Sequence, residues 1–229
     1  MVLRSSPHES CFFDDDWSNI QSVRENCKKI NAVCVGITEV DWATWLTGLT
    51  GNPFAEFITR LQKDGILSRE VISTGFTQYD RLIAWAENIP GKKCVFFDWD
   101  YTLSMASGVL SVNPQEYGCT FQDMLYYYVG GEERFNRLTA MFTRLRQLDV
   151  DLYILTNNPV CGCKYPLINL DAYGEPRLRG LPKMTGADFF GQLLQGLGIP
   201  ADHLLASGRN TKYNQNKARL LKEKFKLFC

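Results

Sequence analysis

The chain has no hydrophobic run that approaches the roughly 20 apolar residues of a membrane-spanning helix. Residues 1–9 also lack the apolar core of a secretory signal peptide. Positive and negative side chains balance, with 25 Lys and Arg against 25 Asp and Glu, so net charge gives no reason to expect a polyanionic partner. We therefore expect a globular protein without membrane association and without bulk nucleic-acid binding.

A zinc site and a disulfide framework are also not indicated. The eight cysteines include no CxxC pair, and Cys161-Gly162-Cys163 is too short and isolated to hold zinc. Cys34 and Cys94 fall in predicted strands and Cys27 in a predicted helix, where a free cysteine commonly acts as a small buried residue. The pattern favours a reducing, cytoplasmic location. A chain of 229 residues, 45% hydrophobic and 22% charged, can form one well-buried domain plus an appendage.

One stretch, residues 93–104, combines a buried strand with acidic residues at its end. Four apolar residues, 94–97, follow a Pro90-Gly91 turn signal and predict a buried strand. Asp98, Asp100 and Thr102 come directly after them. Carboxylates at the carboxyl end of such a strand lie where open α/β sheets bind ligands, and a pair of them favours a hard cation such as Mg²⁺. A lone Asp-x-Asp would indicate only a polar loop, but the combination indicates a functional site.

Other segments predict further strands and helices. Residues 11–13, 32–35, 152–155 and 203–206 are short apolar runs typical of strands. The run at 152–155 ends in Thr156-Asn157, which offers a hydroxyl and backbone N–H groups to a phosphate, although Thr-Asn is also ordinary turn chemistry. Residues 159–184 predict a long loop, of a kind that is often functional. Apolar spacing predicts helices at about 18–29, from Asn52-Pro53 to Gly65, near 79–86, at 132–148, after 185–188 and at 216–226.

The stretch at 93–104 resembles the first motif of the haloacid dehalogenase-like (HAD) phosphatase superfamily, in which the first Asp is the nucleophile. Thr156, 58 residues after Asp98, fits the second motif of that family. Lys217 is the best match to the lysine of the third motif, with Lys212 as the alternative. The Asp-Trp-Asp form and the segment Leu-Thr-Asn-Asn at 155–158 are also similar to HAD-like proteins of large DNA viruses. The resemblance implies an α/β fold: a three-layer Rossmannoid parallel sheet of about five strands, helices on both faces and a small cap at about 105–131.

The fourth HAD motif, a strand ending in acids, has no match after Lys217. Phe12-Phe13-Asp14-Asp15, with Asn19 four residues beyond the second acid, resembles it instead. We therefore interpret the chain as a circularly permuted HAD domain, since surface termini tolerate such rearrangements. Residues 11–36 would be the permuted last part of the core, 38–91 a helical connector and 92–229 the core with motifs one to three. The alternative is a truncated chain in which residues 14–16 form a solvated acidic loop.

The resemblance implies a Mg²⁺-dependent phosphomonoester hydrolase that acts through an aspartyl-phosphate. It leaves open whether the phosphorylated substrate is a small molecule, a protein or a nucleic-acid end. An inactive HAD-like binding module and a phosphotransferase are the alternative functions. The implied roles are nucleophile for Asp98, general acid and base for Asp100, metal binding for Asp98, Asp15 and the Asp100 carbonyl, phosphate binding for Thr156, Asn157 and Lys217, and support for Asp14, Asn19 and Thr102.

Overall fold

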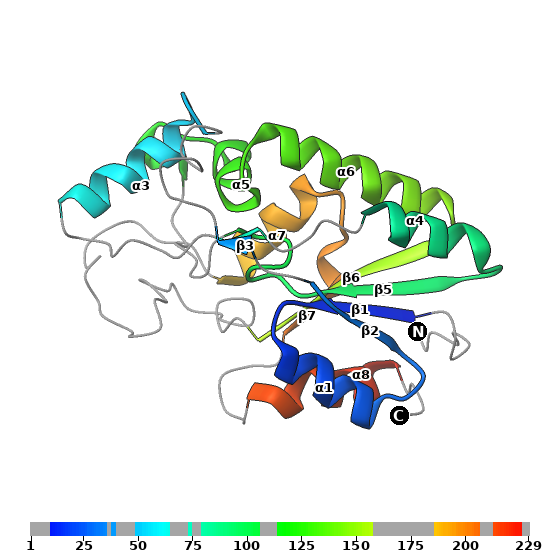
Figure 1. The fold of residues 1–229 in the computed structure, drawn as a ribbon. Coiled ribbons are helices and arrows are strands. Elements are labelled where there is room, and N and C mark those ends of the chain that lie inside the picture. Colours follow the sequence, from blue (N-terminus) through cyan, green and yellow to red (C-terminus); the bar gives the residue numbers. More distant parts are fainter. Residues whose placement is uncertain are drawn as a thin grey trace.

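The protein is built around a five-stranded parallel sheet with the strand order β2-β1-β5-β6-β7 (Figure 1). The structure, a computed structural model, describes residues 10–35, 38–39, 49–64, 73–74, 79–105, 114–157, 186–206 and 213–225. The strands of the sheet are β1 (Ser10–Asp14), β2 (Asn31–Cys34), β5 (Lys93–Phe97), β6 (Val150–Thr156) and β7 (Leu204–Ala206).

The central strands send apolar side chains to both faces of the sheet. In β5, Val95 and Phe97 belong to one buried cluster, whereas Cys94 and Phe96 belong to a second cluster on the opposite face. This alternation follows from the two-residue period of a strand. Because helices cover both faces, every position of β5 is buried, and residues 94–97 form one continuous apolar run.

Helices form the two outer layers (Figure 1). On one face, α1 (Trp17–Asn26) packs against α8 (Tyr213–Phe225). The other face carries α4 (Tyr79–Asn88), α5 (Phe121–Val129), α6 (Glu132–Gln147) and α7 (Gly186–Gly196), and α3 (Pro53–Lys63) packs on α5. The predicted α/β fold, with five parallel strands and helices on both faces, is confirmed as a Rossmann-like three-layer arrangement. Among the described residues, none of these helices has the length and apolar character to cross a membrane.

The described part of the predicted connector, residues 38–91, is helical with one small addition. Asn52 begins α3, and its side chain accepts hydrogen bonds from the backbone N–H groups of Phe54 and Ala55, both at 3.0 Å. This confirms the predicted start, because Asn caps the first turn and Pro suits the next position. The addition is an antiparallel pair of short strands, which sequence periodicity cannot reveal: β3 (Thr38–Glu39) and β4 (Ser73–Thr74).

The segment predicted as a small cap, about 105–131, contains a helix that we did not predict. Its described part holds a short 3-10 helix, η1 (Pro114–Tyr117), followed by α5. Thr120 and Asp123 form a capping box at the start of α5, and Gly130 ends it in the left-handed conformation. These end signals are present in the sequence, but the intervening Tyr-rich run has no clear helical face. Most of α5 is buried in the core cluster.

The remaining described elements match the predicted positions to within a few residues. A 3-10 helix, η2 (Ala201–His203), precedes β7. Cys11, Cys34, Cys94 and Cys119 are free, whereas Cys27, at the end of α1, is disulfide-bonded. The expectation of a free thiol is therefore wrong at Cys27, because pairing depends on which segments meet in space and not on cysteine spacing. The predicted loop 159–184 and the alternative lysine Lys212 lie outside the described residues.

Candidate active site

Strand pairing brings the N-terminal acids to the end of the Asp98 strand. β1 and β5 are parallel neighbours in which Phe12 pairs with Phe96 and Phe13 with Phe97. The backbone N–H of Asp98 continues this ladder by donating to the carbonyl of Phe13 at 2.9 Å. Since both strands end at the same edge of the sheet, Asp14 and Asp98 emerge side by side although they are far apart in sequence. The prediction that residues 12–13 lie beside residues 95–97 is confirmed.

A buried lysine joins the two acids. The Nζ of Lys217, on α8, lies 2.6 Å from Oδ2 of Asp14 and 2.8 Å from Oδ1 of Asp98. The side chains are almost completely buried, with exposed fractions of 2% for Lys217, 0% for Asp14 and 8% for Asp98. One ammonium group is thus shared by two carboxylates, and with both carboxylates ionised these three buried groups carry an excess of negative charge.

The protonation equilibria of this group reflect that excess. Burial raises the pKa of Asp98 well above its ordinary value; the charge of Lys217 opposes the rise, and Asp14 and Asp100 add to it. Burial alone would lower the pKa of Lys217, but the charges of Asp98 and Asp14 outweigh it and the pKa is raised. Lys217 therefore stays protonated at neutral pH, and the group would gain from an additional positive charge.

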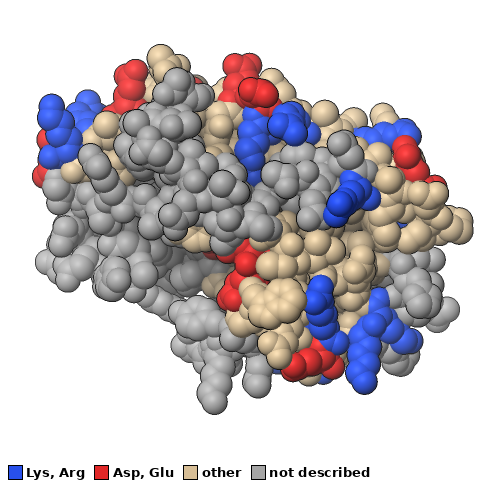
Figure 2. Space-filling view, in the orientation of Figure 1, with Lys and Arg blue, Asp and Glu red and all other residues tan. Residues whose placement is uncertain are grey.

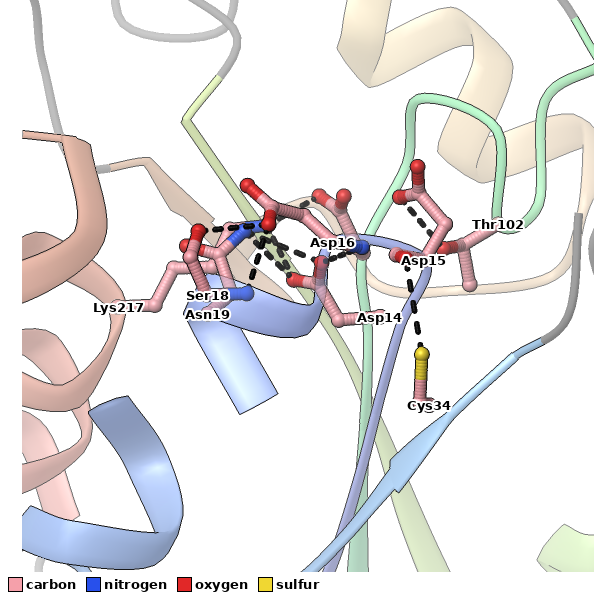
Figure 3. A network of polar contacts seen from close by, with 9 residues as sticks. Asp14, Asp15, Asp16, Ser18, Asn19, Cys34, Thr102 and Lys217 are labelled. Carbon is pink, nitrogen blue, oxygen red and sulfur yellow. Dashed lines mark hydrogen bonds and ion pairs between the residues drawn. The ribbon is translucent and has the colours of Figure 1, made fainter. Parts of the chain in front are cut away.

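Asp14 is held by several donors besides Lys217 (Figure 3). The Nδ2 of Asn19 lies 3.1 Å and 3.2 Å from its two carboxylate oxygens, and the backbone N–H of Asp16 donates to Oδ1 at 2.9 Å. Asp16 in turn caps α1 by accepting from the backbone N–H of Ser18 at 2.8 Å. The first turn of α1 thus fixes Asp14, and its contacts suit the supporting role predicted for Asp14 and Asn19.

Asp15 completes a group of carboxylates that fits a metal ion. One carboxylate oxygen from each of Asp14, Asp15 and Asp98 lies within 4.8 Å of the other two. Thr102 donates to Oδ1 of Asp15 at 3.4 Å. Burial, followed by the charge of Asp14, raises the pKa of Asp15 to about 6. An all-oxygen donor set with excess negative charge is what Mg²⁺ or another hard cation prefers, so the residues present fit such an ion.

The group of carboxylates reaches solvent on one side. Asp15 is half-buried and Asp16 is exposed. In the space-filling view, a few acidic atoms are visible near the middle of the face shown (Figure 2). The site is therefore open to a small ion from the side of Asp15, whereas Asp14 and Lys217 are enclosed.

The other predicted residues follow the ends of the same strands. Asp100 is half-buried and close enough to Asp98 to raise the pKa of that carboxyl. Thr156 is the last residue of β6, which pairs in parallel with β5, and its side chain is fully buried. Asn157 follows it and is half-buried. The site residues predicted from the sequence therefore belong to this carboxyl edge of the sheet or, for Asn19 and Lys217, to the helices α1 and α8, from which both side chains contact Asp14.

Sequence reasoning missed one residue near the site, Arg134. Its guanidinium donates to the backbone carbonyls of Thr102 and Leu103, in the turn that follows Asp98. An arginine in the first turn of an amphipathic helix is ordinarily a surface residue, so the sequence carries no signal for this contact. Comparisons of the chain with protein-family models, with curated proteins and with solved structures find no match, so the geometry of this site alone supports a functional assignment.

Proposed function

We propose that the protein is a Mg²⁺-dependent phosphomonoester hydrolase of the HAD type that acts through an aspartyl-phosphate on Asp98. The observation that carries the proposal is the convergence of Asp98, Asp15 and the buried Lys217 at one edge of the sheet. The strand order supports the circular permutation as well, because β1 and β2 occupy the places next to β5 that the last strands of an unpermuted HAD domain would take.

In the first half of the proposed reaction, a carboxylate oxygen of Asp98 attacks phosphorus and the bond to the leaving oxygen breaks. Asp100, as a neutral carboxylic acid, gives its proton to that leaving oxygen. Asp100 lies two residues beyond the nucleophile and is half-buried, whereas Asp98 is buried, and this supports the role. The hydroxyl of Thr156 and the backbone N–H of Asn157 would orient the phosphoryl oxygens, and Lys217 would stabilise the negative charge on them.

In the second half, water attacks phosphorus while the Asp100 carboxylate takes its proton. The bond between phosphorus and Asp98 then breaks, which releases inorganic phosphate and restores both carboxyl groups. Asp98, Asp15 and the backbone carbonyl of Asp100 would hold Mg²⁺, which when bound supplies positive charge for the transferring phosphoryl group. A phosphotransferase would use the same acids and differ only in having an alcohol as the acceptor.

The test is hydrolysis of an aryl phosphate with and without Mg²⁺, comparing wild type with Asp98→Asn. We expect the variant to lose activity by about a thousandfold or more, because a covalent nucleophile cannot be replaced by an amide. Asp151→Asn is the matched control, because Asp151 lies on the neighbouring strand β6 and pairs at the surface with Lys92 at 3.0 Å. Asp98→Asn activity within about tenfold of wild type would contradict the nucleophile role.

Intact-mass measurement after rapid quenching gives an independent readout. Wild type should carry one added phosphoryl group during turnover, and Asp98→Asn should carry none. Wild type without any turnover or phosphoryl transfer would instead favour a non-catalytic binding module.

A further inference from the structure

The turn that follows Asp98 is tied to helix α6 by Arg134. The Nη1 of Arg134 donates to the carbonyl of Leu103 at 2.6 Å and to the carbonyl of Val129, the last residue of α5, at 2.8 Å. Its Nη2 donates to the carbonyl of Thr102 at 3.3 Å. One half-buried guanidinium therefore bridges the turn, the end of α5 and the start of α6.

The turn itself, residues 99–105, is ordered by its own backbone. The carbonyl of Trp99 accepts from the N–H groups of Leu103 and Ser104 at 3.1 Å and 2.9 Å. Trp99 is fully buried and packs edge-on against Phe190 of α7. One end of the turn is thus anchored in the core, and Asp100 lies between this anchor and the carbonyls of Thr102 and Leu103 that Arg134 holds.

The junction between α5 and α6 provides a fixed support on the other side. The N–H of Met105 donates to the carbonyl of Tyr128 at 2.7 Å, and the hydroxyl of Ser104 donates to the same carbonyl at 3.2 Å. Gly130, in the left-handed conformation at the end of α5, lies so close to the Met105 side chain that a Cβ there would clash with it. The turn and the junction are therefore packed as one unit.

We infer that Arg134 is a positioning residue, which holds the turn 99–105 so that Asp100 and Thr102 keep their places beside Asp98 and Asp15. The inference rests on the proposed phosphatase function. Its route runs through the backbone: Arg134 fixes the Thr102 carbonyl, and the Thr102 hydroxyl contacts Asp15 at 3.4 Å. Arginine suits this role because its planar fork offers several donors in fixed directions from two terminal nitrogens, whereas a lysine carries its donors on a single rotating nitrogen.

The test compares Arg134→Met with wild type on an alkyl phosphate and on an aryl phosphate with a good leaving group. We expect kcat/KM for the alkyl ester to fall roughly tenfold to a hundredfold, as for other residues that orient catalytic groups. The aryl ester should lose much less, because a good leaving group needs little help from the general acid Asp100. A second readout needs no turnover. When Mg²⁺ is added to metal-free protein, the Mg²⁺ concentration that gives half of the maximal rise in Tm should be higher for Arg134→Met than for wild type.

Arg146→Met is the matched control. Arg146 lies on the same helix, about 18 Å farther along α6, and also donates to a backbone carbonyl, that of Gly198 at 2.8 Å. It should change neither the alkyl-to-aryl ratio nor the Mg²⁺ response. If Arg134→Met fails to fold, Arg134→Lys decides, since it keeps the charge and loses the fork.

Equal losses on both esters together with an unchanged Mg²⁺ response in Arg134→Met would overturn the inference. It would also be overturned if Arg146→Met changed the alkyl-to-aryl ratio and the Mg²⁺ response as Arg134→Met does. Absence of turnover in wild type would count against the proposed function. An active wild type with an unchanged ratio and Mg²⁺ response in the Arg134 variants would count against the positioning role alone.

Discussion

Replacing Lys217 by Met tests the charge balance of the buried group most directly. The substitution removes the ammonium that lies 2.6 Å from Asp14 and 2.8 Å from Asp98, and keeps an apolar side chain of similar length. The two carboxylates, which are both almost completely buried, then lie together without a counter-charge. We expect a large loss of stability in metal-free protein near neutral pH.

The magnitude follows from the burial of both partners. Removing one member of a buried ion pair costs about 3–5 kcal/mol, because it leaves an uncompensated buried charge. The loss should be smaller at low pH. Without Lys217 the pKa of Asp98 in the folded protein rises further above its value in the unfolded chain, which is about 4. The contribution of protonated Asp98 to the free energy of unfolding is therefore fully present below pH of about 4, and it is lost as the pH rises through the folded-state pKa. Lys217 in wild type stays charged throughout this range.

Mg²⁺ should restore part of the loss. A ligand that binds only the folded state stabilises it by about 2.7 kcal/mol at a concentration of a hundred times its dissociation constant. The cation would bring positive charge to the carboxylates that Lys217 otherwise neutralises. Lys217→Met combined with Asp98→Asn should also regain stability, because the second substitution removes one of the unpaired charges.

The assay is urea unfolding with a chelator and then with Mg²⁺, near neutral pH and near pH 5. Lys93→Met is the matched control, because Lys93 is also buried but its Nζ donates to the backbone carbonyls of Ile89 and Gly91, at 2.9 Å and 2.7 Å. The loss of stability in Lys93→Met should depend on neither pH nor Mg²⁺. A change below about 1 kcal/mol in Lys217→Met, or an equal change at both pH values, would refute the argument.

Three further predictions concern single acids of the site. Asp15→Ala should raise the Mg²⁺ concentration needed for activity, since it removes an oxygen ligand. If plots of activity against Mg²⁺ concentration were the same for wild type and Asp15→Ala, the assignment of Asp15 to a permuted fourth motif would be wrong. In metal-free protein the pKa of Asp15 is raised to about 6, so the free energy of unfolding should fall as the pH rises from about 4 through 6. Asp15→Asn should weaken this pH dependence in unfolding measured across that range, and Mg²⁺ should lower the pKa of Asp15 measured by NMR titration. Asp100→Asn should slow alkyl phosphates more than aryl phosphates, and equal losses in steady-state kinetics would remove the general-acid role.

Local patterns in the sequence were sufficient for the strands and for the first acids. The runs at 11–13, 94–97 and 152–155 are continuous and apolar, which is the pattern of strands buried on both faces, and each is a strand of the sheet. Asp98 and Asp100 were identified because they follow such a strand directly. The start of α3 at Asn52-Pro53 was equally local, since one side chain caps the first turn.

The partners of Asp98 were decided by the tertiary structure. Parallel strands need long crossover connections, so the sequence around Asp98 does not show that β1 lies beside β5. Nor does it show that Asp14 and Asp15 join Asp98 in one group of carboxylates. The sequence proposed this pairing through a resemblance, and the register of the sheet confirms the placement. Lys217 and Arg134 are a sharper case. Arg134 looks like a surface residue of an amphipathic helix, and the sequence proposed Lys217 only through the resemblance. The packing of α8 and α6 brings the charges of both side chains to buried acceptors.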